Sequence, residues 1–313
     1  MSPLTTMSRR DAVKAIGAGV VALAGSPLSS IRGAEPSDNQ PIMLSRKIPT
    51  SGEALPVIGM GTWQTFDVGT SAAERGPLRE VLAAFVSLGG KLIDSSPMYG
   101  RSEEVVGDLA AEFGLRPKLF VATKVWTSGK VAGVTQMEDS MRKLKASPID
   151  LIQVHNLVDV DAHLDTLRAW KAEGRVRYIG VTHYTASGHA AVAKILSSQS
   201  VDFVQINYSV GEREAEQHLL PLAREKGVAV IANRPFAAGD LFRRLQSKPL
   251  PTWVKDIDCD SWAQVLLKFV ISHPAVTCAI PATAKVSHLK DNMKAGLGRL
   301  PDERLRAKIA AEA

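Results

Sequence analysis

The chain has 313 residues, of which 45% are hydrophobic, so it is long enough for one large domain or two ordinary ones. Its formal net charge is +6, but residues 1–34 hold four basic residues and one acidic residue, which leaves +3 for the rest. This small charge, without a stripe of Lys and Arg interleaved with aromatics, argues against a nucleic-acid partner, and no Cys, His or carboxylate spacing indicates a metal site.

The first segment, residues 1–34, has the pattern of an export signal. Arg9 and Arg10 precede an apolar stretch over residues 15–25, which is too short to span a bilayer. Paired arginines ahead of a Gly/Ala-rich stretch resemble a twin-arginine signal. We therefore expect the twin-arginine export machinery as a partner, a periplasmic location, and no stable membrane insertion after cleavage near Ala34. Because Arg32 fits poorly in a small-residue cleavage site, an uncleaved N-terminal membrane anchor is the alternative.

After residue 40, short apolar runs alternate with amphipathic segments, which is the order expected of parallel strands joined by crossover helices. Strands are expected at 57–63, 91–95, 119–125, 150–155, 176–183, 203–208, 228–233 and 277–281. Helices are expected at 78–88, 103–113, 136–144, 163–173, 188–196, 214–226, 262–272 and 287–294. Eight such pairs predict an α/β protein with a (β/α)8 TIM barrel. A doubly wound sheet would need fewer strands and a Gly-x-Gly-x-x-Gly turn, which is missing.

Three segments lie outside this alternation. Residues 43–49 and 54–56 flank a turn at 50–53 and predict a β-hairpin ahead of the first barrel strand. Residues 234–260 are too long for an ordinary connection and are expected to cover or shape a binding site. Residues 301–313 are expected to form a C-terminal helical tail.

Polar residues interrupt the apolar strands where a core would normally exclude them. Asp94 ends the second strand and Tyr99 follows it, while Lys124 and His155 lie near the ends of the third and fourth strands. In a barrel, the active site forms at these C-terminal ends. A buried ammonium without a partner costs several kcal/mol, so we expect Lys124 to pair with Asp94.

This pattern resembles the aldo-keto reductase family over roughly residues 41–300. The matching segments are Gly59-Met60-Gly61-Thr62-Trp63, Ile93-Asp94, Tyr99-Gly100, Glu103 with Val106-Gly107, Thr123-Lys124, residues 149–155, residues 179–183, Gln205 and residues 280–292. The resemblance implies that residues 41–300 form the reductase barrel, that Asp94, Tyr99, Lys124 and His155 are the catalytic tetrad, and that the substrate is an aldehyde or ketone reduced by NAD(P)H.

The chemistry of the four residues is consistent with that reaction. Hydride transfer to a carbonyl leaves an alkoxide that must receive a proton, and a free phenol with a pKa of ~10 is a weak donor near neutral pH. A cation beside the phenol lowers this pKa. We expect Lys124 to supply the charge, Asp94 to hold Lys124 protonated, Tyr99 to deliver the proton, and His155 to hydrogen-bond the carbonyl oxygen.

The resemblance also implies a nicotinamide cofactor across the barrel mouth, with NADP(H) preferred and NAD(H) as the alternative. The residues it places at the cofactor are Thr62, Trp63, Thr182, His183, Gln205, Pro235, Phe236, Thr283, Lys285, His288 and Asn292. The chain departs from the family at Asn233, where a stacking Tyr is frequent, and at Ala282 and His288, where cations are frequent. Lys285 remains as a permanent cation near the start of the last barrel helix, whose free N–H groups can also accept an anion.

The substrate end is expected to be lined by Trp63, Trp126 and Asn156, because aromatic walls are common in pockets for small carbonyl compounds. Two other functions are weighed against the reductase. One is a cofactor-binding regulatory or interaction module on the same barrel, with little turnover. The other is a barrel hydrolase with a carboxylate pair, which is disfavoured because Asp94 has no matching second carboxylate at a strand end.

Overall fold

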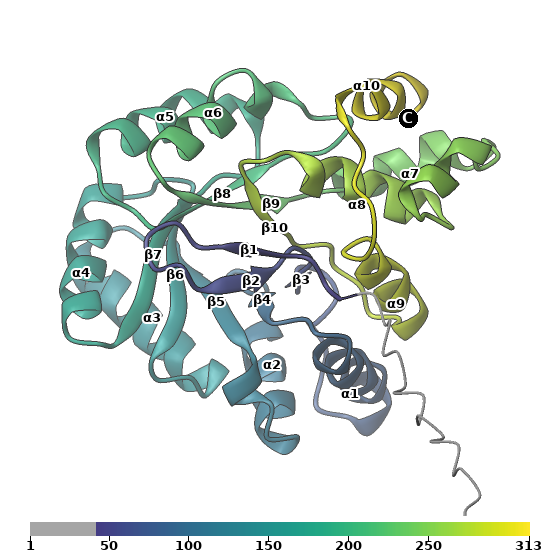
Figure 1. The fold of residues 1–313 in the computed structure, drawn as a ribbon. Coiled ribbons are helices and arrows are strands. Elements are labelled where there is room, and N and C mark those ends of the chain that lie inside the picture. The colour runs from purple at the N-terminus through teal and green to yellow at the C-terminus, as the bar shows by residue number, and fades with distance from the viewer. Residues whose placement is uncertain (1–41) are drawn as a thin grey trace, which may run out of the picture. The chain divides into compact units, whose positions relative to one another are not determined.

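A computed structural model describes residues 42–313 and shows a barrel of parallel strands with helices around it (Figure 1). Neighbouring strands pair in chain order. The strands are β3 (Met60–Gly61), β4 (Leu92–Asp94), β5 (Phe120–Val125), β6 (Ile149–His155), β7 (Val176–Thr182), β8 (Phe203–Asn207), β9 (Ala229–Asn233) and β10 (Val276–Ala279). The barrel closes where the amides of Gly59 and Gly61 donate to the carbonyls of Ala279 and Pro281, at 2.8 and 3.1 Å. The (β/α)8 prediction is confirmed.

The outer helices follow the expected alternation. They are α1 (Ala72–Ser87), α2 (Ser102–Glu112), α3 (Lys130–Leu144), α4 (Val160–Ala172), α5 (His189–Ser198), α6 (Leu219–Glu225), α8 (Trp262–Ser272) and α9 (Val286–Lys294). The helix expected at 214–226 is shorter than predicted, because residues 214–216 form a separate 3-10 turn. The long segment after β9 contains α7 (Asp240–Leu245) and a 3-10 helix (Thr252–Ile257), and the chain ends in α10 (Glu303–Glu312).

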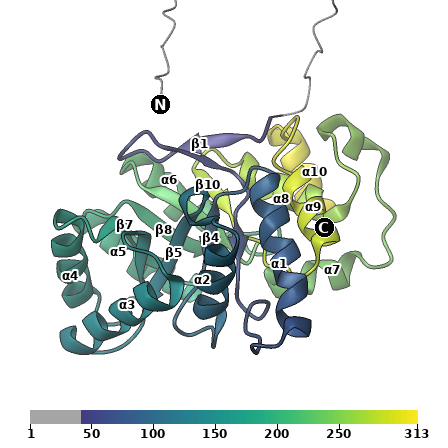
Figure 2. The ribbon, with the colours of Figure 1, turned by 90° about the horizontal axis from the view of Figure 1, so that it is seen from below.

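The predicted hairpin is present and lies across one end of the barrel (Figure 2). It pairs β1 (Ser45–Lys47) with β2 (Ala54–Pro56). Ile48 and Leu55 are fully buried and pack into the barrel interior, while Glu53 accepts from the phenol of Tyr178 at 2.7 Å. The hairpin therefore closes the barrel at the N-terminal ends of its strands, which we call the floor.

The interior of the barrel changes from apolar to polar along the strands. Alternate strand residues share one face, so the inward residues on each strand are two apart. At the floor these are Leu92, Phe120, Leu151, Tyr178 and Phe203, which form one buried cluster. At the other end, the mouth, the same faces carry Asp94, Lys124, Gln153 and Gln205, each at most 2% exposed. Burial of each large floor side chain contributes roughly 1.5–3 kcal/mol, and this apolar floor supports the polar layer above it.

Within residues 42–313, no helix is long and apolar enough to cross a membrane, and no cluster of three or more His, Cys, Asp or Glu could hold a metal ion. The export signal predicted for residues 1–34 lies outside the described residues.

Candidate active site

The structure brings the four expected catalytic residues to one end of the barrel. Asp94 ends β4, Lys124 lies in β5, His155 ends β6, and Tyr99 lies in the turn between β4 and α2. The pairing of β4 with β5 and of β5 with β6 sets these side chains beside one another. The parallel pairing thus brings together residues that are far apart in the sequence.

Lys124 and Asp94 form a buried ion pair. Lys124 Nζ lies 2.6 Å from Asp94 Oδ2 and also donates to the carbonyl of Ser95 at 2.7 Å, and the two side chains are 1% and 3% exposed. Burial by itself would lower the pKa of Lys124, but the charges of Asp94 and Tyr99 reverse this and raise it above its ordinary value. Lys124 is therefore a permanent cation at neutral pH.

Tyr99 lies against this cation, with Lys124 Nζ 4.9 Å from the centre of its ring. The net effect on its acidity differs from the expected one. Burial raises the pKa of the Tyr99 phenol, and Asp94 adds to the rise, so together they outweigh the lowering by Lys124. Tyr99 is consequently a protonated phenol at neutral pH, which is the state that a proton donor requires.

His155 is buried beside the ion pair and is uncharged. Burial, followed by the charges of Lys124 and His183, lowers the pKa of His155 to about 3. Its Nδ1 is buried without a hydrogen-bond partner among the described residues. A neutral imidazole can donate one N–H to an acceptor such as a carbonyl oxygen, without competing with Tyr99 as an acid.

Amide side chains that the sequence analysis did not connect to Asp94 surround its other oxygen. Gln205 Nε2 donates to Asp94 Oδ1 at 2.9 Å, and Gln153 Nε2 donates to the same oxygen at 3.3 Å. Asn233 Nδ2 in turn donates to Gln205 Oε1 at 3.3 Å. Gln153 was visible in the sequence as a polar residue between apolar neighbours, in the same run that drew attention to His155.

Apolar and aromatic side chains are exposed around the mouth. Trp63, Met98, Trp126 and Tyr184 are 38–48% exposed, and they lie in the loops that follow β3, β4, β5 and β7. The Trp126 and His155 rings lie 5.7 Å apart, and Tyr184 stacks on His183 at 5.9 Å. Tyr184 was missed in the sequence, although it directly follows His183. These side chains give the mouth an apolar rim suited to a small organic molecule.

Known proteins are similar to this chain in sequence and in architecture. The Aldo/keto reductase family model matches residues 57–310. The chain belongs to the aldo/keto reductase family. It is 33% identical over 259 residues to methylglyoxal reductase YeaE of Escherichia coli, covering 80% of this chain and 89% of that protein. An aldo-keto reductase from Klebsiella pneumoniae in complex with NADPH superimposes with a TM-score of 0.72 and 27% identity, covering 86% of this chain and 95% of the other. A further solved structure, of an aldo/keto reductase from Klebsiella pneumoniae in complex with NADP and acetate, superimposes with a TM-score of 0.68 and 28% identity, covering 83% of this chain and 92% of the other.

Several residues of this aldo/keto reductase that were expected to bind the nicotinamide already contact other parts of the protein. Thr62 is fully buried, and its hydroxyl donates to the Asp94 carbonyl at 3.0 Å. His183 hydrogen-bonds with Thr185, and Thr182 is buried at the end of β7. Pro235 and Phe236 follow β9, where the Phe236 ring lies 4.7 Å from Phe242. Asn156 has left-handed backbone geometry and a buried Oδ1 with no partner among the described residues.

At the other end of the expected cofactor path, α9 begins at the mouth side of β10. Thr283 Oγ1 accepts from the amide of Lys285 at 3.1 Å, and α9 has no side-chain cap. Lys285 and His288 are exposed at the start of the helix, whereas Asn292 is buried on its inner side. The helix start therefore offers backbone N–H groups and one ammonium to an anion, while the inward position of Asn292 limits its access to a ligand.

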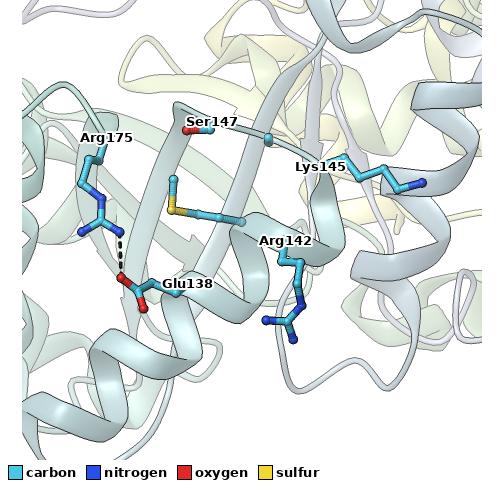
Figure 3. A pocket seen from close by; sticks show the side chains of 7 residues that line it. Glu138, Arg142, Lys145, Ser147 and Arg175 are labelled. Atoms are coloured by element: carbon cyan, nitrogen blue, oxygen red, sulfur yellow. Dashed lines mark hydrogen bonds and ion pairs between the residues drawn. The ribbon is translucent and has the colours of Figure 1, made fainter.

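A surface depression elsewhere on this reductase does not belong to the site (Figure 3). It is lined by residues at the end of α3 and before β6 and β7, which places it toward the floor. Its cations are paired: Arg175 with Glu138 at 2.9 Å, Arg142 with Asp139 at 2.7 Å and Lys145 with Asp108 at 2.7 Å. No residue of the tetrad lines it.

Proposed function

We propose that the protein reduces an aldehyde or ketone to an alcohol with a nicotinamide cofactor, and that Tyr99 donates the proton. The observation that carries this proposal is the buried set of Asp94, Lys124 and Tyr99, in which a protonated phenol lies beside a fixed ammonium. The Escherichia coli relative, a methylglyoxal reductase, and the NADPH bound in the Klebsiella pneumoniae structure support it. Cofactor oxidation followed against a panel of aldehydes and ketones that includes methylglyoxal tests the proposal.

Each residue of the set has a distinct role in this reaction. The bound cofactor supplies a hydride to the carbonyl carbon, and the oxygen then gains negative charge. Tyr99 transfers its proton to that oxygen, and the phenolate left behind is stabilised by Lys124, whose charge is in turn balanced by Asp94. The neutral His155 N–H donates to the same oxygen and fixes its direction. This complete proton path distinguishes the proposal from a regulatory module with little turnover.

Different residues would hold the two ends of the cofactor at the mouth. The nicotinamide would be held by side chains at the ends of β3, β7 and β8, namely Trp63, Thr182, His183 and Gln205. Pro235 and Phe236, which follow β9, would lie along the cofactor. Thr283, Lys285 and His288 lie at the start of α9 and would hold the adenosine end. The start of α9 has no side-chain cap, and the exposed Lys285 ammonium beside it has no ion-pair partner in the part of the chain that the structure describes. This position suits a phosphate group, so we propose NADP(H) as the preferred cofactor and NAD(H) as a weaker one.

We expect Lys285→Ala to weaken NADPH binding on the order of tenfold and His288→Ala to change it little. A lysine ammonium is a compact point charge that can pair with a phosphate, and a tenfold loss of affinity corresponds to about 1.4 kcal/mol of that interaction. Lys290→Ala, an exposed lysine further along α9, is the matched control and should leave affinity unchanged. The measurement is the Kd for NADPH and NADH by fluorescence titration. Equal wild-type affinity for the two cofactors would contradict the preference.

For the substrate, we propose a small carbonyl compound with an apolar substituent. Trp63, Trp126 and Asn156 would line the substrate end, and the exposed rings of Trp126 and Tyr184 beside His155 give that end its apolar character. A carbonyl oxygen directed at Tyr99 and His155 would leave its substituent against these rings.

We further propose that the enzyme is exported to the periplasm by the twin-arginine route after it folds and binds its cofactor in the cytoplasm. The proposal rests on Arg9, Arg10 and the apolar stretch after them. Ligand that binds only the folded form stabilises it by mass action, which favours a route that carries folded proteins. If the signal is not cleaved, the same segment would serve as an N-terminal membrane anchor.

Arg9→Lys combined with Arg10→Lys should leave full-length, active enzyme in the cytoplasm, because the barrel begins after residue 40. Cell fractionation followed by activity and nucleotide analysis checks this expectation. Arg32→Lys, which keeps the pair intact, is the control and should be exported normally. Export that persists in the double variant, or periplasmic protein entirely free of nucleotide, would refute the proposal.

A further inference from the structure

Gln153 is a buried polar side chain to which the reaction described above assigns no role. It is fully buried in β6, where an unbonded amide would cost free energy. Among the described residues its side chain bonds only Asp94, at 3.3 Å, and Gln205, at 3.4 Å. Within residues 42–313 its side chain makes no hydrogen bond to a backbone group, and it is closed off from solvent, so its donor serves the Asp94 carboxylate.

The strand register explains why Gln153 reaches Asp94. Gln153 is the Cα partner of Lys124 across the β5–β6 pair, so both side chains point into the barrel at the same level. On the other side its Cα partner is Gly180 of β7, which has no side chain. Gln205 of β8 can therefore approach Gln153 across β7, and both amides meet the same carboxylate oxygen.

The charge of Asp94 fixes the orientation of each amide. An ionised carboxylate only accepts hydrogen bonds, so Gln153 and Gln205 must both direct their Nε2 atoms at Oδ1. Gln205 Oε1 then faces Asn233 Nδ2, which donates to it at 3.3 Å. The result is a directed chain of hydrogen bonds from β9 to β4, which ends at the carboxylate that holds Lys124.

We propose that Gln153 is a positioning residue that holds Asp94 in the rotamer that directs Oδ2 at Lys124. Gln205 shares this task, but Gln205 is also one of the residues that we place beside the cofactor. Gln153 is the donor dedicated to Asp94, and it acts on Tyr99 only through Asp94 and Lys124. This inference rests on the proposed reductase function.

Two substitutions at this position separate a positioning role from simple packing. Gln153→Met keeps the shape but removes the donor, so kcat should fall about tenfold or more at every pH, since hydrogen bonds to charged groups are strong. Gln153→Glu can donate through its O–H only when protonated. Its activity should therefore approach that of the wild type at acidic pH and fall as the new carboxyl ionises beside Asp94.

The pH profile is interpretable because the other ionisable groups near position 153 are known. They are Asp94 on β4, Tyr99 in the turn after it, Glu103 on α2, Lys124 on β5, His155 on β6, His183 after β7 and Cys278 on β10. Of these, His155 titrates near pH 3, and Tyr99, Lys124 and Cys278 titrate well above neutrality. Burial lowers the pKa of His183, but that residue is present in the wild type as well. Burial raises the pKa of Glu103, which is likewise present in the wild type. A limb found only in Gln153→Glu therefore arises from the new carboxyl and its coupling to Asp94.

The experiment measures kcat from acidic to alkaline pH, the Kd for NADPH and the thermal midpoint for wild type and both variants. Gln264→Met is the matched control, because the buried Gln264 also donates to an aspartate, Asp291, at 2.6 Å, but it lies on the outer helix α8 and hydrogen-bonds to no tetrad residue within residues 42–313. It should lose stability while keeping the wild-type pH profile. A wild-type profile in Gln153→Glu, or undiminished kcat in a folded Gln153→Met, would overturn the inference. Wild-type protein that reduces no carbonyl would instead refute the proposed function.

Discussion

Replacing Tyr99 by phenylalanine should abolish carbonyl reduction while leaving the Kd for NADPH within a few fold. The hydroxyl is needed only where charge develops on the substrate oxygen, so its loss falls on the chemical step. A general acid contributes ~10²-fold or more, and we expect kcat to fall at least that far. Steady-state kinetics and cofactor titration together provide the measurement.

Tyr178→Phe is the control for this substitution, because it removes a phenol at the floor of the same barrel. Tyr178 bonds Ser51 and Glu53 of the hairpin at 2.8 and 2.7 Å, so its loss should lower stability and leave kcat nearly unchanged. In the wild type, the raised pKa of Tyr99 should keep the phenol protonated, and the reduction rate high, to a pH above the ordinary value of ~10. A Tyr99→Phe enzyme with more than about a tenth of the wild-type kcat would show that another group donates the proton.

Lys124→Met should unfold the protein more readily as well as inactivate it. The substitution leaves the Asp94 carboxylate buried at 3% exposure without its counter-charge, and breaking a buried pair in this way costs about 3–5 kcal/mol. The phenolate formed at Tyr99 would also lose the cation that stabilises it. Urea denaturation and kcat measure the two effects separately.

Adding Asp94→Asn to Lys124→Met removes the orphaned charge and should recover most of the lost free energy of unfolding. Activity should not return, because the cation beside Tyr99 is still missing. If the double variant were as unstable as the single one, the loss would come from packing and not from the unpaired carboxylate. If Lys124→Met alone kept wild-type kcat, the proton path would be wrong.

The strands and the position of the tetrad could be predicted because each leaves a local signal. Short apolar runs such as 203–208 mark strands, and a lysine inside one of them, Lys124, demands a buried partner. The turns and helices within residues 234–260 could not be predicted in this way. They are short and interrupted by prolines, and left-handed residues such as Ala237 and Ala238 have no sequence signal.

The pKa of Tyr99 depends on a balance between burial and neighbouring charges, which cannot be predicted from a sequence pattern. The sequence indicates a neighbouring cation, but the extent of burial follows from the packed barrel, and here burial outweighs that cation. The burial of Thr62 and Asn292 also follows from the packed barrel and could not be predicted. Both lie in segments that match the family, yet both are buried. Gln153 illustrates the reverse case, because its polarity was plain in the sequence but its partners were not. Asp94 and Gln205 lie 59 and 52 residues away along the chain, and they meet Gln153 only across the barrel.

The hairpin at the floor determines how the enzyme can be attached to a solid support. The described residues begin just before β1, which belongs to the hairpin at the floor (Figure 2). Tyr99 lies at the other end of the barrel, in the turn after β4. A resin or sensor chip coupled through a tag placed directly before β1 would therefore hold the floor and leave the aromatic rim open to diffusing substrate. Coupling through lysines is less favourable, because Lys285 would be among the groups consumed.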